Sequence, residues 1–424
     1  MMQAEAHNRV NGKRLTIANC LHSRVNNFDF LRLASAFLVL FSHSWPIRDG
    51  NAEHEPYHRL TGTIIGGEVA LGIFFIISGM LVARSFLADP RLFSYLKKRA
   101  LRIFPGLMAC VIFCVMVVGP LFTTLKLKAY FQDSDTQHFM RNAILYPNHY
   151  YLGGVFDPYW DSRGVVNGSL WTLPIEFIMY LVVAAVGVVG VLRHKPWMVI
   201  ITMLAALSWI AIESGGLASK APFDKYRVWL EDAPRLAILF LSGTLLLLFA
   251  DKIVLKWQWM AIALVIFALS WNLPFQAIAH ITGLQRMPTA KLDRLHDLYT
   301  YALTCLALPY IVMYLAFLPT PRLQAAAKHG DFSYGIYLYA YPVQQMLMRK
   351  WEHINFVLFI ALACIGTFIL AYLSWHCIEK PFLRLKGRST RTVRNMENQS
   401  APPLPPMQLS ISQRLADMNM ISRG

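Results

Sequence analysis

The stretch FDFLRLASAFLVLFSHSWP, residues 28–46, places an arginine and a histidine inside a largely apolar run. Such a run can cross a lipid bilayer as a helix, which takes about 20 residues. Arg32 and His43 are eleven residues apart, so on a helix they share one face and differ in depth by about 16 Å. Ionisable groups within membrane helices usually line cavities, and the stretch therefore predicts a polar path through a helix bundle.

Each of these two residues also has a purely structural explanation. Arg32 can extend to lipid headgroups at the membrane boundary, and His43 can be a buried histidine with an ordinary hydrogen-bond partner. Neither explanation accounts for their position on one helix face, which favours the polar path.

The composition extends this pattern to the whole chain. Of its 424 residues, 56% are hydrophobic and only 15% are charged, and the mean hydropathy is +0.41. Soluble domains carry charge on about a quarter of their residues. The net charge of +16 does not indicate nucleic acid, because the basic residues cluster in short segments between apolar runs, as in cytoplasmic loops that meet anionic lipids.

About ten apolar runs predict an all-α, polytopic membrane protein with about ten transmembrane helices. Basic residues in the first 27 residues, in the connection between runs two and three, and after the last run place both termini in the cytoplasm. We expect three parts: a basic N-terminal segment (1–27), a transmembrane domain (28–386) and a disordered cytoplasmic tail (387–424). The expected spans are 28–46, 67–87, 104–123, 170–192, 197–213, 234–250, 257–273, 298–317, 334–348 and 355–376.

Neither the cysteines nor the N-terminal segment indicates another class of protein. The six cysteines lie mostly in or beside apolar runs and form no metal-ligand spacing, so we expect neither a metal site nor a disulfide framework. The polar, basic first 27 residues do not read as a signal peptide.

The second span combines small residues with a serine. Gly72, Gly79 and Ala83 form a stripe that permits close contact with another helix. Ser78 lies beside this stripe, and we expect a packing hydroxyl rather than a catalytic one there.

Two arginines follow at the predicted cytoplasmic end of the third span. Arg99 and Arg102 are three residues apart, so their guanidinium groups share one helix face and suit a phosphate-bearing ligand. The alternative is the ordinary bias of basic residues toward the cytoplasm.

The fourth span opens with NGSLWTLPIEF, residues 167–177. Glu176 is expected about two turns below the outer boundary, at the depth of His43, where the two side chains form an acid–base pair. The alternative is that Glu176 pairs with another buried polar group for structural reasons. Asn167, Ser169 and Trp171 are expected at the outer rim, where an acceptor with a hydroxyl group binds.

Several of these motifs together resemble the integral membrane acyltransferase-3 family, which includes O-antigen and exopolysaccharide O-acetylases. The resemblance covers roughly residues 26–385 and its motifs come in the family's order. The matching segments are the pair Arg32 and His43, FFIISGML (74–81), KRALRIFP (98–105), NGSLWTLPIEF (167–177), GDFSYGIYLYAYPVQQ (330–345) and SWHCIEKPF (374–382).

The resemblance implies a ten-helix enzyme of the bacterial cytoplasmic (inner) membrane. It implies no permanently bound cofactor, acetyl-coenzyme A or another acyl-coenzyme A as donor, and a glycan or lipid-linked glycan as acceptor. Arg32 and His43 correspond to the family's essential pair, and Arg99 and Arg102 to contacts with coenzyme A phosphates; Arg32 is expected to bind the donor together with these two arginines. Many relatives have two adjacent acidic residues after the S-L-W motif, whereas here Glu176 is followed by Phe177.

Two mechanisms are compatible with His43. It is either the general base for the acceptor hydroxyl or a nucleophile that carries the acyl group, and we favour the base. The alternative function is a secondary transporter or polysaccharide-export component in which Arg32, His43 and Glu176 form a relay.

Overall fold

The computed structural model describes residues 9–10, 13–23, 26–145, 149–156, 164–215, 224–324 and 330–386. Contacts group the chain into two units, Met1–Leu383 and Arg384–Gly424, and the helical domain described below is the first. The predicted tail, residues 387–424, lies outside the described residues, as do parts of the predicted N-terminal segment.

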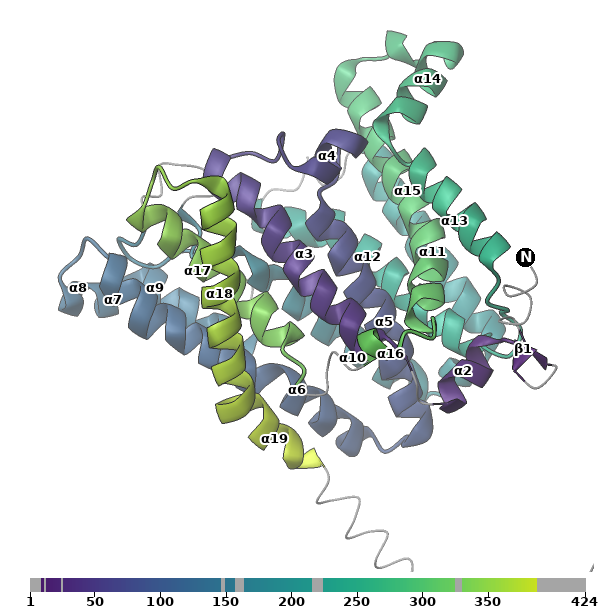
Figure 1. Ribbon diagram of the computed structural model, residues 1–424, viewed down its shortest axis with the longest axis horizontal. Helices are drawn as coiled ribbons and strands as arrows, with labels where there is room; N and C mark the ends of the chain where they lie inside the picture. The colour runs from purple at the N-terminus through teal and green to yellow at the C-terminus, as the bar shows by residue number, and fades with distance from the viewer. Residues whose placement is uncertain are drawn as a thin grey trace, which may run out of the picture. The chain divides into compact units, whose positions relative to one another are not determined.

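The described chain is built from helices, with one antiparallel pairing between two-residue strands, β1 (Arg9–Val10) and β2 (Lys13–Arg14) (Figure 1). This confirms the all-α prediction. The helices are α2 (Ile17–Ser23), α3 (Phe28–Asp49), α4 (Pro56–Thr61), α5 (Gly66–Ala88), α6 (Leu92–Phe113), η1 (Cys114–Val118), α7 (Gly119–Phe122), α8 (Leu127–Gln132), α9 (Ser134–Met140), η2 (Arg141–Ile144), η4 (Gly168–Trp171), α10 (Thr172–Val188), η5 (Val191–Arg193), α11 (Lys195–Gly215), α12 (Asp224–Leu248), α13 (Trp257–Leu269), α14 (Asn272–Thr282), η7 (Leu284–Arg286), α15 (Thr289–Ala316), α16 (Pro321–Gln324), α17 (Ser333–Lys350), α18 (Phe356–Ser374), η8 (Trp375–Glu379) and α19 (Lys380–Arg384).

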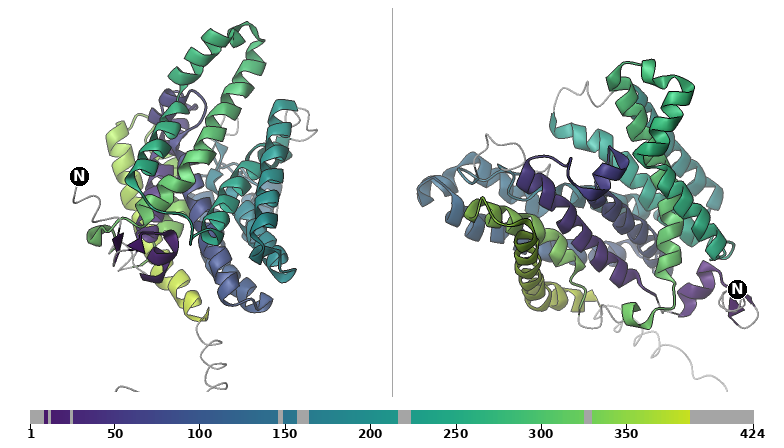
Figure 2. Two further views of the ribbon diagram at one scale, coloured as in Figure 1. Left: turned by 90° about the vertical axis from the view of Figure 1, so that its right-hand side faces the viewer. Right: turned by 45° about the horizontal axis from the view of Figure 1, so that its top comes forward.

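Among the described residues, seven helical segments are long and apolar enough to cross a membrane, and the bent pair α13–α14 makes eight. The two parts of that pair meet at 66°, and Figure 2 shows α14 with the adjoining ends of α13 and α15 extending past the other helices. Large apolar side chains such as Met108, Ile112 and Met116 are exposed at spacings of one helical turn, as expected of a lipid-facing surface. The protein is therefore a multi-pass membrane protein.

The two remaining predicted spans, 234–250 and 334–348, coincide with α12 and α17, which are long enough to cross a membrane but too polar or too charged to count among the candidate spans. The reason in α17 is that protein surrounds it: all residues from Ser333 to Gln345 are buried. Its tyrosine hydroxyls donate to backbone carbonyls of other segments, Tyr334 to Ile103 at 2.8 Å and Tyr337 to Ser169 at 2.6 Å. A helix enclosed in this way needs no lipid-facing apolar stripe.

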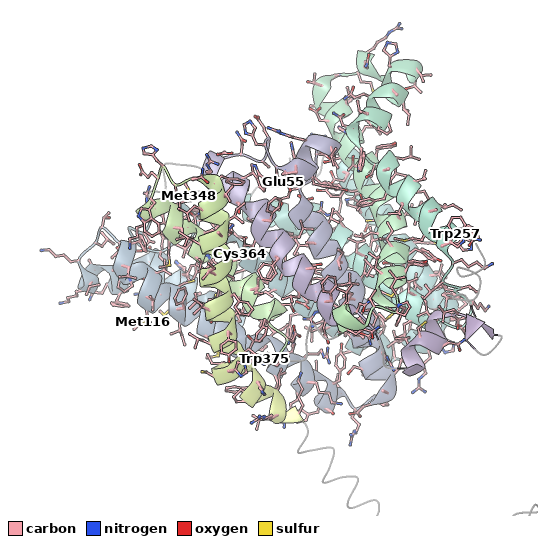
Figure 3. All side chains as sticks on the ribbon, in the orientation of Figure 1. Glu55, Met116, Trp257, Met348, Cys364 and Trp375 are labelled. Atoms are coloured by element: carbon pink, nitrogen blue, oxygen red, sulfur yellow. The ribbon has the colours of Figure 1, made fainter. Side chains whose placement is uncertain are left out.

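Helices α3 and α17 run in the same direction and define the two ends of the bundle. Both begin where Arg32 meets Asp331, and both finish where Ile47 and Met348 line one pocket. These are called the Arg32 end and the Met348 end below. Figure 3 labels Met348 at one end of α18 and Trp375 toward the other.

Helices α5 and α12 approach each other closely at two glycines. A Cβ atom on Gly79 would lie 1.8 Å from the carbonyl oxygen of Phe240, and one on Gly243 would lie 2.0 Å from that of Ile76. At the same contact, Thr244 Oγ1 donates to the Gly79 carbonyl at 3.1 Å. The predicted small-residue stripe of the second span therefore forms a close helix contact at Gly79.

Replacing Gly79 with alanine is expected to destabilise the bundle by about 1–3 kcal/mol, because the new methyl group forces α5 and α12 apart. Thermal unfolding of the detergent-solubilised protein measures the effect. Gly366→Ala is the matched control within a helix, since its Cβ would come no closer than 3.2 Å to another atom, a side-chain methyl of Val343, and would meet no backbone. Equal unfolding midpoints for the two variants would contradict the close contact.

A buried ion cluster joins α5, α12 and α15 and explains the charges in α12. Arg235, which is 4% exposed, donates to Glu68 at 3.0 Å and to Asp232 at 2.6 Å. The Tyr301 hydroxyl also donates to Glu68, and the Arg235 guanidinium lies 3.9 Å from the centre of the Tyr301 ring. Because every charge has a partner of opposite sign, the cluster is a structural link between helices.

Candidate active site

Asp331, directly before α17, holds two arginines from distant helices. Its Oδ2 accepts from Arg32 of α3 at 2.9 Å and from Arg102 of α6 at 2.7 Å, and its Oδ1 accepts from Ser333 Oγ at 2.6 Å. Arg102 also lies 5.5 Å from the centre of the Tyr334 ring. The cluster therefore joins α3, α6 and α17 at the Arg32 end.

The charges of the neighbouring arginines set the protonation state of Asp331. Burial alone would raise the pKa of this carboxyl, but Arg102 and Arg32, together with the Ser333 hydroxyl, hold the pKa well below its usual value. Asp331 is thus an anion that neutralises part of the positive charge of the two guanidiniums. The sequence predicts that Arg32 and Arg102 bind the donor and that Arg102 contacts its phosphates, whereas the structure shows both arginines already paired with a carboxylate.

Arg99, the third arginine predicted to bind the donor, has different neighbours. Its guanidinium lies 5.6 Å from the centre of the Tyr180 ring and 5.9 Å from that of Tyr95. Its Nε atom is buried without a hydrogen-bond partner, and the described residues provide no ion pair to it. Arg99 is therefore the one of the three whose cation is not neutralised by a carboxylate within the described part of the chain.

Glu176 faces a small cavity of about 40 Å³ together with Arg32 and Arg102. Its Oε1 accepts from Ser78 Oγ at 3.3 Å and from the Tyr180 hydroxyl. Ser78 thus has a polar contact in the cavity in addition to its place in the packing of α5. The cavity is lined by Arg32, Leu71, Phe74, Phe75, Ser78, Arg102, Ile103, Thr172, Leu173, Glu176, Ser333, Tyr334 and Tyr337.

This position corrects the predicted depth of Glu176, which sequence analysis placed level with His43. The segment before α10 enters the bundle, so the helix does not begin at a membrane boundary. Asn167 and Ser169 are 0% and 1% exposed, and Asn167 Nδ2 donates to the carbonyl of Leu338, within α17, at 2.9 Å. Within the described residues no hydrogen bond joins Glu176 to His43, so the predicted pair is not formed in this structure.

The same segment corrects the predicted location of the three rim residues. Asn167 and Ser169 are buried, and Trp171 is half-buried beside the hydrophobic core rather than on an outer rim. Asn167 uses its side chain to cap the turn that follows, because its Oδ1 accepts from the backbone N–H of Ser169 at 3.1 Å. Their role in acceptor binding stays a prediction.

His43 lies deeper toward the Met348 end, against α17. Its ring meets the Tyr341 ring edge-on, with 5.5 Å between centroids, and its Nδ1 atom is buried without a hydrogen-bond partner. Because Arg32 contacts the start of the α17 segment and His43 contacts its middle, the two share a face of α3, as predicted.

One face of α17 links the cavity to His43 and was not assigned from sequence. Tyr334 and Tyr337 line the cavity, Tyr341 contacts His43 one turn further on, and Gln345 follows after another turn. The Tyr337 hydroxyl also lies 2.6 Å from Thr172 Oγ1. The spacing of polar residues in GDFSYGIYLYAYPVQQ is the sequence signal for this stripe.

Glu379 is a second buried acid that sequence analysis left without a role. It is 3% exposed, its Oε1 accepts from Ser374 Oγ at 3.0 Å, and its Oε2 has no partner. A π-helical turn, η8, carries it inward against α6, where its Cγ would lie 3.4 Å from a Cβ on Gly106. The sequence feature that could have identified Glu379 is an acidic residue beside the end of the last apolar span.

The chain is similar to known proteins over most of its length. A family described as an acyltransferase domain matches residues 25–376. A protein named O-acetyl transferase from Shigella phage Sf6 is 28% identical over 361 residues, which cover 84% of this chain and 96% of that protein. Nodulation protein 10 from Rhizobium leguminosarum bv. viciae is 29% identical over 382 residues, 85% of this chain and 94% of that protein. No solved structure matches the chain.

Proposed function

The chain belongs to the acyltransferase-3 family, and on this premise we propose that this membrane O-acyltransferase uses acyl-coenzyme A as donor and a glycan as acceptor. The acyl group is acetyl or a similar group, and the acceptor hydroxyl belongs to an exported polysaccharide or its lipid-linked precursor. The enzyme works in the cytoplasmic membrane of a bacterium with its Arg32 end toward the cytoplasm. The observation that supports this most is the face of α3 that presents a cation at one depth and His43, with a free Nδ1, at another.

The donor enters from the Arg32 end. Coenzyme A phosphates are too highly charged to enter lipid, and Arg99 offers them an unneutralised guanidinium at this end. A phosphate that reaches Arg32 or Arg102 competes with the Asp331 carboxylate. The cavity of about 40 Å³ holds little more than one water molecule, so side chains around Glu176 move aside when the pantetheine arm extends toward His43.

The chemical step is a direct transfer assisted by His43. The acceptor oxygen bonds to the thioester carbonyl carbon, the carbon–sulfur bond breaks, and coenzyme A leaves as a thiolate. His43 takes the proton from the attacking hydroxyl and returns it to the thiolate. A neutral imidazole with an unpartnered Nδ1 suits this base role.

The function is tested with purified protein in lipid nanodiscs, supplied with acetyl-coenzyme A and a glycan extract of the producing cells. We expect release of free thiol together with an acyl increment in the mass spectrum of the glycans. A transporter or export component releases no thiol, and that result would contradict the proposal.

A further inference from the structure

A polar pocket opens at the Met348 end, where α3 and α17 finish. Its volume is about 490 Å³. Figure 3 labels Met348 at this end of the bundle, away from Trp375. The polar pocket is lined by Ile47, Arg48, Gln345, Met348, Arg349, Glu352 and His353.

The floor of the polar pocket lies next to His43. Ile47 follows His43 by four residues on α3, and Gln345 follows Tyr341 by four on α17. Residues four apart share a helix face. The face of each helix that forms the His43–Tyr341 contact therefore also reaches the pocket, about 6 Å further along that helix. His43 therefore lies between the donor cavity at the Arg32 end and the polar pocket at the Met348 end.

The lining of the polar pocket suits a hydroxyl-rich group. Arg349, Glu352 and His353 take part in no ion pair among the described residues, so their donors and acceptors are available to a ligand. The Arg48 guanidinium lies 5.0 Å from the centre of the Phe356 ring. Its Nε atom is 3.6 Å from Asp49 Oδ1, which is longer than a hydrogen bond, so no short ion pair holds it in place. Such a mixture of donors and acceptors matches a sugar, which presents both.

An apolar groove adjoins the polar pocket. Its volume is about 520 Å³, and it shares Glu352 and His353 with the polar pocket. On its other side it continues onto α18, a candidate membrane span, where Leu358 is 51% exposed. The apolar groove is lined by Trp351, Glu352, His353, Ile354, Asn355, Leu358 and Leu362.

We propose that the polar pocket and the apolar groove together form the acceptor site and that the acceptor is a glycolipid. The sugar occupies the polar pocket with its reacting hydroxyl toward His43, and the hydrocarbon chain lies in the apolar groove against α18. A free polysaccharide has nothing to place in a groove that faces lipid, whereas a lipid-bound sugar reaches both surfaces without leaving the membrane. This inference rests on the proposed acyl transfer and names its acceptor class.

The first test follows the label from radioactive acetyl-coenzyme A in membranes of the producing cells, which contain the native acceptor. Label is expected first in the glycolipids extracted by organic solvent. Label confined to lipid-free polysaccharide would overturn the glycolipid acceptor while leaving acyl transfer intact. Absence of label from every glycan fraction would instead contradict the proposed function.

The second test changes the apolar groove alone. Leu358→Gln is expected to lower glycolipid labelling about tenfold, or about 1.4 kcal/mol, because the apolar contact between this side chain and the hydrocarbon chain is lost. Leu373→Gln is the matched control, since Leu373 is also on α18 and is likewise 51% exposed, outside both pockets. Equal labelling by the two variants would overturn the assignment of the groove.

A third variant tests the polar pocket. Arg349→Ala is expected to raise the acceptor concentration needed for half-maximal labelling about tenfold, while Arg193→Ala, an exposed arginine on another segment, leaves it unchanged. Stabilisation of each variant by coenzyme A reports donor binding and should match wild type. An unchanged acceptor dependence in Arg349→Ala would remove that residue from the site.

Discussion

Replacing His43 with alanine is expected to lower acyl transfer at least about 100-fold, which is the usual contribution of a positioned general base. Among the described residues, no hydrogen bond brings another imidazole or carboxylate to the Nδ1 atom of His43, so nothing replaces the lost proton acceptor. Thiol release and glycan acylation by the purified variant in nanodiscs measure the effect. The variant should still bind coenzyme A, because the site proposed for the donor's phosphates lies at the other end of the face.

His376→Ala is a matched control for this substitution. His376 also packs against a tyrosine ring in a candidate membrane span, 4.3 Å from Tyr372 by ring centroids and tilted by 45°, but it lines neither the cavity nor the two pockets. We expect it to keep near-normal turnover. Turnover of His43→Ala within tenfold of wild type would remove His43 from the mechanism and leave the polar path with a structural role only.

The helices and the α3 face could be predicted because they rest on local sequence patterns. Apolar length identified the spans, and the spacing of Arg32 and His43 fixed their common face through helix geometry alone. The same reasoning found Gly79, whose close contact depends on small residues along one helix. Each of these conclusions needs only the residues of a single segment.

The partners of these residues could not be predicted, because they are far away in sequence. Asp331 is 299 residues from Arg32 and 229 from Arg102, and its segment GDFSYG was noticed without a role. The depth of Glu176 was wrong for a related reason. A prediction from hydropathy assumes that a span starts at a membrane boundary. Here the hydrogen bond from Asn167 to the Leu338 carbonyl holds the start of the span inside the bundle.

Asp331→Ala is expected to reduce stability by about 3–5 kcal/mol, because it leaves two enclosed guanidiniums without their shared anion. Arg32, Arg102 and Asp331 are each no more than 20% exposed, so water cannot fully replace the lost contact. Thermal unfolding in detergent measures the loss. Asp331→Asn keeps the volume and serves where the alanine variant is too unstable to purify.

The double variant Asp331→Ala, Arg102→Met separates the ion pairs from general packing. Removing one partner of an enclosed pair is more harmful than removing both, so the double variant should be more stable than the sum of the two single changes by about 1–3 kcal/mol. Strict additivity would show that the contacts at 2.9 Å and 2.7 Å do not support the bundle.

The single variant Asp331→Ala also tests whether Arg32 and Arg102 receive donor phosphates. If they do, coenzyme A supplies the missing anion, and it should raise the unfolding temperature of Asp331→Ala more than that of wild type. Asp89→Ala is the control, because Asp89 pairs with Arg91 and Lys98 in the connection between α5 and α6. An equal response of wild type and Asp331→Ala would mean that the phosphates bind elsewhere, and Arg99, whose Nε has no partner, would then be the first candidate.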